Sequence, residues 1–254
     1  MAEEVCLDCG GSGWKIVERD GVSGAERCEC AREGRSERIE DSAGIPPLYR
    51  NASFDNFQIP KDNDLAARDL HAIRQTVLNY AHEFPTAAKP GLLLIGDPGS
   101  GKTHLAVAAL RRIIAKGFQG VFFDYQNLLD RIRSGFDPNS GTSDREAYRV
   151  ALDAEVLLLD DLGAHRVLPW IEDVVTAMIT HRCNNRLALI ATTNLPDPEA
   201  GDRVSHKQAD GTVDYRRTLA DQIGQRGRSR LFEMCKVVHM PLVRDFRLRK
   251  TSAF

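Results

Sequence analysis

The stretch "GLLLIGDPGSGKTH", residues 91–104, decides the fold class. Its first five residues form a short apolar run, which is typical of a buried strand. The motif G-x-x-x-x-G-K-[ST] follows directly. Its fixed positions are Gly96, Gly101, Lys102 and Thr103. A helix is predicted from Lys102 to about residue 116. Strand, glycine-rich loop and helix in this order predict a phosphate-binding loop, because backbone N–H groups and the positive helix end then face one anion.

This loop predicts a site for ATP. Lys102 is expected to reach the β- and γ-phosphates, and Thr103 to give its hydroxyl to Mg²⁺. A chance glycine-rich turn is the alternative, and the agreement of motif and context disfavours it. The expected nucleotide contacts are Gly96, Asp97, Pro98, Gly99, Ser100, Gly101, Lys102, Thr103 and His104.

A second part of the site is predicted at "VLLLDDLG", residues 156–163. Four apolar residues place Asp160 at the carboxyl end of a buried strand, where it is expected to hold Mg²⁺. Asp161 follows, and its carboxylate is expected to orient and polarise the attacking water. The alternative is a pair of solvated aspartates at a strand end.

Two further stretches add candidate catalytic residues. In "ALIATTN", residues 188–194, Asn194 is expected to donate to the γ-phosphate or the lytic water, with Thr193 as the second choice. In "QRGRSRLFEMC", residues 225–235, Arg230 is the first candidate and Arg226 the second for a cation inserted into a neighbouring subunit's γ-phosphate site. A solvated basic helix face is the alternative for the arginines.

The order of elements predicts a parallel, three-layer α/β sheet. Five strands are expected, and helical patterns separate them along the chain. The strands are expected near residues 91–96, 120–125, 155–163, 187–194 and 236–240. The polar stretch 197–217 is predicted to be a mobile loop, and residues 218–235 a helix or broken helix.

Four of the six cysteines fall within the first thirty residues. Cys6 and Cys9 form C-x2-C, Cys28 and Cys30 form C-x-C, and eighteen residues separate the two pairs. Four thiolates at such spacing predict a closed, structural zinc shell that would supply the folding free energy of this short segment. Unrelated reduced cysteines and a redox-active pair are the alternatives.

Composition limits the classes of function. The 254 residues are 42% hydrophobic and 28% charged with a formal net charge of −2, as expected for a globular protein with a real core. Nucleic-acid contact must then come from a local patch, and the acidic cysteine segment favours a protein partner. Without a long apolar run or a secretory signal pattern, no membrane association is expected. A cytoplasmic location is expected, where thiols stay reduced.

The stretch "IPPLYRNASFDNF", residues 45–57, separates the cysteine segment from the core. Its two prolines, Pro46 and Pro47, are expected to forbid a helix. Tyr49, Phe54 and Phe57 are expected to anchor it on the core. The predicted domains are 1–44 with the zinc site and a linker, 45–64 as an extended linker on the core, and 65–254 as the ATPase.

The ordered set "GDPGSGKTH", "VLLLDDLG", "ATTN" and "RSRLFEMC" resembles the AAA+ ATPases of the DnaC-type replicative helicase loader group, which includes IstB-like transposition ATPases. The resemblance runs from about Pro46 to the last residue. It implies ATP hydrolysis by a P-loop core without a C-terminal helical lid. It also implies self-association into a ring or spiral in the ATP state. "RDFR", residues 244–247, is similar to an Asp-aromatic-Arg element of this group, so Arg247 is expected at the nucleotide.

The resemblance also implies partners. In helicase loaders a small N-terminal domain, in some a cysteine-rich zinc domain, grips the hexameric replicative helicase. Paired helices over residues 126–153 match where related initiators line a DNA channel. Basic residues expected to meet single-stranded DNA there, or to be solvated surface, are Arg111, Arg112, Lys116, Arg131 and Arg133.

Three functions follow as hypotheses. The first is an ATP-dependent loader of the replicative helicase. The second is an IstB-like ATPase that recruits a transposase to duplex DNA. The third is a zinc-dependent adaptor similar to DnaJ-type units, in which ATP only switches conformation.

Overall fold

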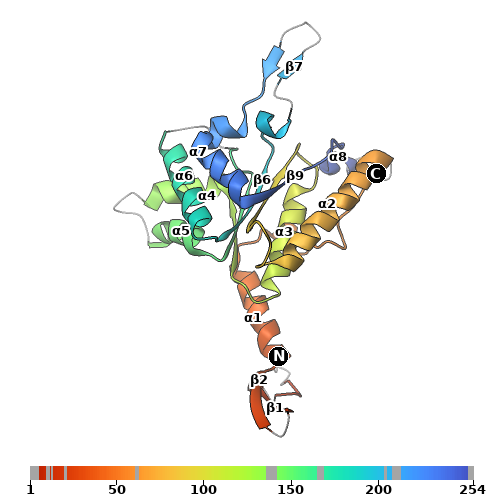
Figure 1. Ribbon diagram of the computed structural model, residues 1–254, viewed down its shortest axis with the longest axis vertical. Coiled ribbons are helices and arrows are strands. Elements are labelled where there is room, and N and C mark those ends of the chain that lie inside the picture. The colour runs from red at the N-terminus through yellow and green to blue at the C-terminus, as the bar shows by residue number, and fades with distance from the viewer. Residues whose placement is uncertain are drawn as a thin grey trace.

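The computed structural model describes residues 6–9, 12, 14–19, 22–60, 63–135, 142–164, 169–202, 205–207 and 213–250. Figure 1 shows a layered body with two projections at opposite ends. One projection is the N-terminal arm, formed by the hairpin β1–β2 and helix α1. The other is the small hairpin β7–β8.

The body is built on a five-stranded sheet in the order β4-β5-β6-β3-β9, and every pairing in it is parallel. Every residue of β3, β5 and β6 is buried, as expected for central strands covered on both faces. The strands are β3 (Gly91–Ile95), β4 (Gly120–Asp124), β5 (Val156–Asp160), β6 (Ala188–Thr193) and β9 (Cys235–His239).

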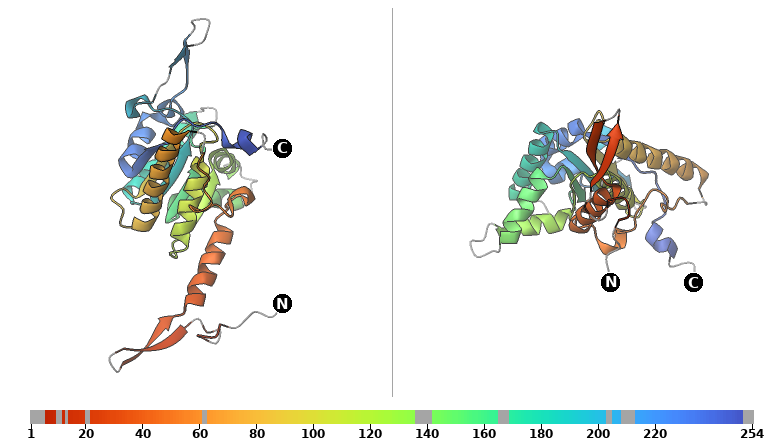
Figure 2. Two further views of the ribbon diagram at one scale, coloured as in Figure 1. Left: turned by 90° about the vertical axis from the view of Figure 1, so that its right-hand side faces the viewer. Right: turned by 90° about the horizontal axis from the view of Figure 1, so that it is seen from below.

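Helices cover both faces of the sheet (Figures 1 and 2). On one face α2 and α3 pack against alternate strand residues such as Leu92 and Leu158. On the other face α4 to α7 pack against the intervening residues, such as Leu93 and Leu157. The helices are α2 (Asp64–Glu83), α3 (Lys102–Ile114), α4 (Tyr125–Gly135), α5 (Thr142–Asp153), α6 (Pro169–Asn184), α7 (Leu219–Met234) and α8 (Phe246–Lys250). The predicted three-layer α/β fold with five parallel strands is confirmed.

The strand order places the site. The chain leaves β3, forms β4, β5 and β6 on one side of it, and then crosses to β9 on the other side. Ligands of open α/β sheets bind at the carboxyl ends of strands where the order reverses in this way. The loop after β3 and the residues that follow β5 and β6 therefore meet at one edge.

Helix α7 is bent at Gly224, whose φ of 74° is left-handed. A side chain at Gly224 would overlap the carboxylate of Glu172 on α6. The helix begins with a capping box in which Thr218 and Asp221 each satisfy the other's backbone N–H. Of the two alternatives given for residues 218–235, the broken helix is confirmed, because two helical segments meet at the non-helical Gly224.

The N-terminal arm consists of β1 (Trp14–Arg19), β2 (Val22–Arg27) and α1 (Glu29–Ser42). Strands β1 and β2 pair antiparallel between the two cysteine pairs. After α1, Phe54 is buried in the core, and Tyr49 and Phe57 are packed against it.

Two local expectations were wrong. A single 3₁₀ turn, η1 (Pro47–Tyr49), forms where the prolines were expected to forbid a helix, because proline is tolerated in a first helical turn. The stretch 197–217, expected as a loop, contains the 3₁₀ turn η2 (Pro198–Ala200) and the paired strands β7 (Ser205–Lys207) and β8 (Val213–Tyr215). Among the helices that the structure describes, none has the length and apolar character needed to cross a bilayer.

Candidate nucleotide site and cysteine cluster

The loop after β3 owes its shape to glycines. Gly99 and Gly101 have φ values of 73° and 95°, in the left-handed region. A Cβ at Gly101 would lie 2.6 Å from Cε2 of Phe57, and a Cβ at Gly99 would overlap Asp245. The missing side chains at these two positions therefore let the segments that carry Phe57 and Asp245 approach the loop closely.

Lys102 begins α3 and is 6% exposed. Its Nζ donates to the carbonyl oxygens of Gly96 at 2.8 Å and Asp97 at 3.0 Å. Burial lowers the pKa of Lys102, and the carboxylates of Asp161 and Asp160 act in the opposite direction. The ammonium therefore lies at the loop, where its hydrogen bonds to these two carbonyl oxygens could be replaced by hydrogen bonds to phosphate oxygens.

Asp160 lies at the end of β5 and is buried. Its Oδ1 accepts from the hydroxyls of Thr103 at 2.9 Å and Thr192 at 2.6 Å. Burial raises the pKa of Asp160, while the hydrogen bond from Thr192 lowers it. The predicted magnesium pair, Thr103 and Asp160, is in contact, and its oxygens are of the kind that Mg²⁺ prefers. Thr192 was missed because threonine at a strand end carries no distinctive signal.

Asp161 adopts a left-handed conformation with φ of 54°. Its backbone N–H donates to Thr192 Oγ1 at 3.0 Å. Asp161 is exposed and lines a cavity beside the phosphate loop. Aspartate is one of the few non-glycine residues that adopt this conformation readily.

Asn194 follows β6, is exposed and lines the same cavity. Thr193, the second choice from sequence, is buried and its hydroxyl donates to the carbonyl of Leu162 at 2.8 Å. Of the two, Asn194 is the residue placed to meet a ligand.

The cavity has a volume of about 700 Å³, in the range of small-ligand sites. The phosphate loop, Asp161 and Asn194 form one part of its lining. Segment 48–60 forms a second part, which sequence analysis did not assign to the nucleotide. Polar and aromatic residues of this segment in the lining are Tyr49, Asn51, Asn56, Phe57 and Gln58. The C-terminal segment adds Arg244 and Arg247, as expected for Arg247.

Of the other loop residues predicted to contact the nucleotide, some line the cavity and others bond to the protein itself. Pro98 and Ser100 line the cavity, and Ser100 Oγ also donates to the carbonyl of Asp97 at 2.8 Å. The Asp97 carboxylate lies 3.3 Å from Arg216 Nη1. His104 lines the cavity, but its Nε2 lies 2.9 Å from the carbonyl oxygen of Ser53.

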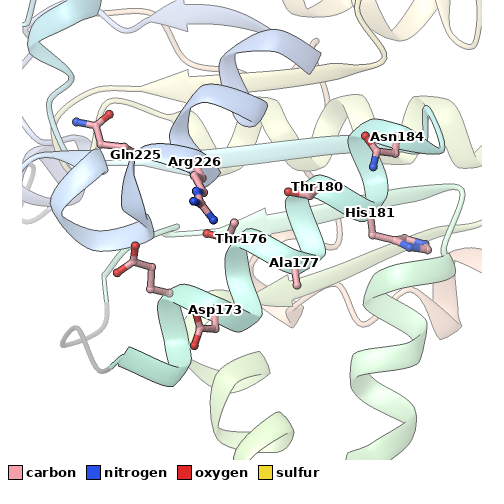
Figure 3. A pocket seen from close by; sticks show the side chains of 9 residues that line it. Asp173, Thr176, Ala177, Thr180, His181, Asn184, Gln225 and Arg226 are labelled. Carbon is pink, nitrogen blue, oxygen red and sulfur yellow. The ribbon is translucent and has the colours of Figure 1, made fainter.

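The three arginines of α7 have different surroundings. Arg226 lies in a groove of about 730 Å³ between α6 and α7, and Figure 3 shows its guanidinium directed toward Thr176. Arg228 forms ion pairs with Asp197 at 2.7 Å and Glu199 at 2.6 Å. Arg230 is exposed and pairs with Glu233 at 2.6 Å. In the described lining of the nucleotide cavity none of the three takes part, so a role there requires a second subunit.

The four N-terminal cysteines converge. Their Sγ atoms all lie within 4.8 Å of one another, with Cys6 and Cys28 3.8 Å apart and Cys9 and Cys30 3.3 Å apart. Tetrahedral zinc with bonds of about 2.3 Å requires sulfurs about 3.8 Å apart, so the cluster fits the metal. The thiol of Cys9, then those of Cys28 and Cys6, raise the pKa of Cys30; a bound cation would favour the thiolates instead. Cys235 is buried and Cys183 partly buried in the core.

Three of the five basic residues predicted to contact DNA bind other parts of this chain. Arg111 pairs with Glu40, and Lys116 Nζ donates to carbonyls at the end of α2, including those of Ala81 at 2.8 Å and His82 at 2.6 Å. Arg131 lies over the ring of Phe123 at 5.7 Å. Arg112 and Arg133 are exposed.

A family model described as IstB-like ATP binding protein matches residues 27–207. Replicative helicase loader DnaC of Escherichia coli K12 is 24% identical over 166 residues, 64% of this chain and 64% of that protein. Uncharacterized protein YdaV of the same strain is 26% identical over 186 residues, 72% of this chain and 69% of that protein. A crystal structure of the DnaC helicase loader matches at 29% identity with a TM-score of 0.60, covering 77% of this chain and 100% of the other.

Proposed function

Because the chain belongs to the family of IstB-like ATP binding proteins, we propose that it is an ATP-dependent loader of a hexameric replicative DNA helicase. Membership accounts for the nucleotide cavity, and the likeness to the DnaC helicase loader supports the helicase as partner. The observation that carries the proposal is the cysteine cluster, whose Cys28 and Cys30 lie where strand β2 leads into helix α1. Helix α1 and the β1–β2 hairpin project from the body as an arm (Figure 1).

The proposed reaction is hydrolysis of ATP to ADP and phosphate. Backbone N–H groups of residues 97–103 and the Lys102 ammonium bind the phosphates. Thr103 and Asp160 would hold Mg²⁺, which neutralises phosphate charge when bound. Asp161 orients the attacking water and accepts its proton, and Asn194 donates to the γ-phosphate. Arg230 of a neighbouring subunit, or Arg226 as the second choice, stabilises the charge that develops.

We assign different binding functions to the proposed domains, which span residues 1–44, 45–64 and 65–254. Cys6, Cys9, Cys28 and Cys30 bind one zinc ion, and the zinc module binds the helicase. Exposed apolar side chains on this module, Leu7, Trp14 and Ile16, support a protein partner. ATP-bound subunits assemble into a ring or spiral and hold single-stranded DNA, with Arg112 and Arg133 as candidate contacts. Hydrolysis releases the helicase, and the protein acts in the cytoplasm.

The test is capture of the replicative helicase encoded by the same genome. We expect the wild type with ATP to retain the helicase, and the double variant Cys9→Ser with Cys30→Ser to lose it because the zinc shell is broken. Cys183→Ser, which changes a cysteine outside the cluster, is the matched control and should bind as the wild type does. Equal capture by the double variant would contradict the role of the zinc module.

A second candidate is supported by the description of the matching family model. In it the protein is an IstB-like ATPase that recruits a transposase to duplex DNA, with the same ATP chemistry. Binding of a transposase together with duplex DNA, without capture of the helicase, would favour this candidate over the loader.

A further inference from the structure

The guanidinium of Arg111, on α3, contacts both the N-terminal arm and the wall of the nucleotide cavity. Its Nε donates to Glu40 Oε1 near the end of α1 at 2.6 Å, and its Nη1 donates to the carbonyl of Ala52 at 2.8 Å. The side chains of Arg111 and Glu40 are 28% and 32% exposed. The planar guanidinium offers both donors in one fixed geometry, which the compact ammonium of lysine reproduces only in part.

Ala52 belongs to the wall of the nucleotide cavity. Next to it the carbonyl of Ser53 is 2.9 Å from His104 Nε2, and further on Phe57 packs against the position of Gly101. His104 and Arg111 are seven residues apart and lie on one face of α3. The helix that begins with Lys102 therefore holds this wall segment at two points, Ser53 and Ala52.

Glu40 belongs to the arm. Helix α1 carries Cys30 in its first turn and has few apolar residues, as is typical of helices that bridge two bodies through solvent. Its far end is fastened to the body, because Phe122 N donates to the carbonyl of Ala43 at 2.7 Å and Ala43 is buried. Figures 1 and 2 show α1 projecting from the body toward the β1–β2 hairpin.

We propose that Arg111 is a positioning residue that couples occupancy of the nucleotide cavity to the orientation of α1 and of the cysteine module it carries. A nucleotide holds the wall at residues 48–60 in place, and Arg111 transmits that order to Glu40. When the nucleotide leaves, residues 48–60 become less ordered, and the orientation of α1 becomes less fixed as a result. By linkage, a partner that fixes the arm must tighten nucleotide binding by the same factor. This inference rests on the proposed ATP site.

The experiment is hydrogen exchange on the full chain with and without a non-hydrolysable ATP analogue. In the wild type we expect the analogue to slow exchange several-fold in residues 36–44 as well as in the phosphate loop. Glu40→Ala cuts only the arm contact, so residues 36–44 should lose the response while analogue affinity stays within threefold of the wild type. Arg111→Ala removes both contacts and should also lower the affinity for the analogue several-fold. Arg111→Lys should recover only part of this affinity.

Arg68→Ala is the matched control, since it removes an exposed arginine from α2, outside both contacts, and should leave both responses intact. The melting temperature of each variant, measured alongside, separates a lost response from lost folding. A response in residues 36–44 of Glu40→Ala equal to that of the wild type would overturn the coupling. Binding of the analogue to the wild type without any response in α1 would also overturn it. Failure of the wild type to bind the analogue would instead overturn the ATP site and this inference with it.

Discussion

At the scale of single residues, the candidate nucleotide site has a buried carboxylate, Asp160, at the position proposed to bind Mg²⁺. Asp160 is buried, and among the residues that the structure describes its hydrogen-bond donors are two neutral hydroxyls, those of Thr103 and Thr192. Burial raises the pKa of its carboxyl above the ordinary value of 3.8. The nucleotide-free protein therefore gives up some folding stability to keep this group ionised at neutral pH.

Asp160→Asn should consequently stabilise the nucleotide-free protein while abolishing hydrolysis. Asparagine keeps an oxygen that accepts both hydroxyls and removes the buried charge. The folded state holds its proton more tightly than the unfolded state, so wild-type stability falls as pH rises above 3.8 toward the folded pKa. At pH 7 we expect the melting temperature of the variant to rise by about 2–4 °C for each kcal/mol gained.

The control for this change is Asp161→Asn. It also removes a carboxylate that we propose to be catalytic, but from an exposed residue, so it should stop hydrolysis without raising the melting temperature. Calorimetry at pH 7 and near pH 4 measures both variants. A gain for Asp160→Asn that does not shrink toward pH 4 would contradict an electrostatic origin.

At the scale of elements, α7 separates arginines that look alike in sequence. Arg228 points toward η2, where the Asp197 side chain is 2% exposed and accepts from it, and it also lies 4.2 Å from the ring centroid of Phe232. Arg226 and Arg230, four residues apart, share another face of the helix. The packing of α7 against its neighbours distinguishes Arg228, which is bound within the chain, from Arg226 and Arg230, the two arginines that we propose to act in a second subunit.

Arg228→Ala and Arg230→Ala should therefore fail in different ways. Removal of Arg228 leaves Asp197 buried without its partner and should cost about 3 kcal/mol of unfolding free energy. Removal of Arg230, an exposed residue, should cost under about 1 kcal/mol, but should slow hydrolysis in the assembled form by about 1,000-fold. Urea unfolding and steady-state ATPase assays measure the two effects.

Glu233→Ala is the matched control on the same surface, because it releases Arg230 from its ion pair and should leave hydrolysis intact. Unchanged turnover in Arg230→Ala and in Arg226→Ala would exclude α7 as the source of the trans-acting cation. Unchanged stability in Arg228→Ala would show that Asp197 finds another partner.

At the scale of the whole molecule, the arm and the body depend on different sources of stability. The body has two apolar clusters, one on each face of the sheet. The β1–β2 hairpin has exposed apolar residues, such as Ile16 at 83% exposed, and a two-stranded hairpin is marginal alone. Its order is expected to come from metal binding at the four cysteines.

Metal removal should accordingly affect one part of the molecule. A strong chelator should release one zinc ion per chain and increase hydrogen exchange in residues 14–27. The main melting transition should move by less than about 2 °C, because the sheet and its helices do not depend on the cluster. Zinc release measured with a colorimetric indicator, together with calorimetry, tests this. A collapse of the main transition would mean that the arm is part of the core.

Sequence patterns alone predicted the parallel sheet, the phosphate loop and the cysteine cluster, because each depends on local periodicity or on residues at short spacing. The contact between Asp160 and Thr103, 57 positions apart, followed from the roles of their two motifs and not from spacing. The tertiary fold sets which other side chains meet across the chain. Thr192 on Asp160, segment 48–60 in the cavity wall, Arg228 on Asp197 and Arg111 between Glu40 and Ala52 all join residues at least 31 positions apart. No spacing rule specifies such contacts, since strand order and helix packing bring them together.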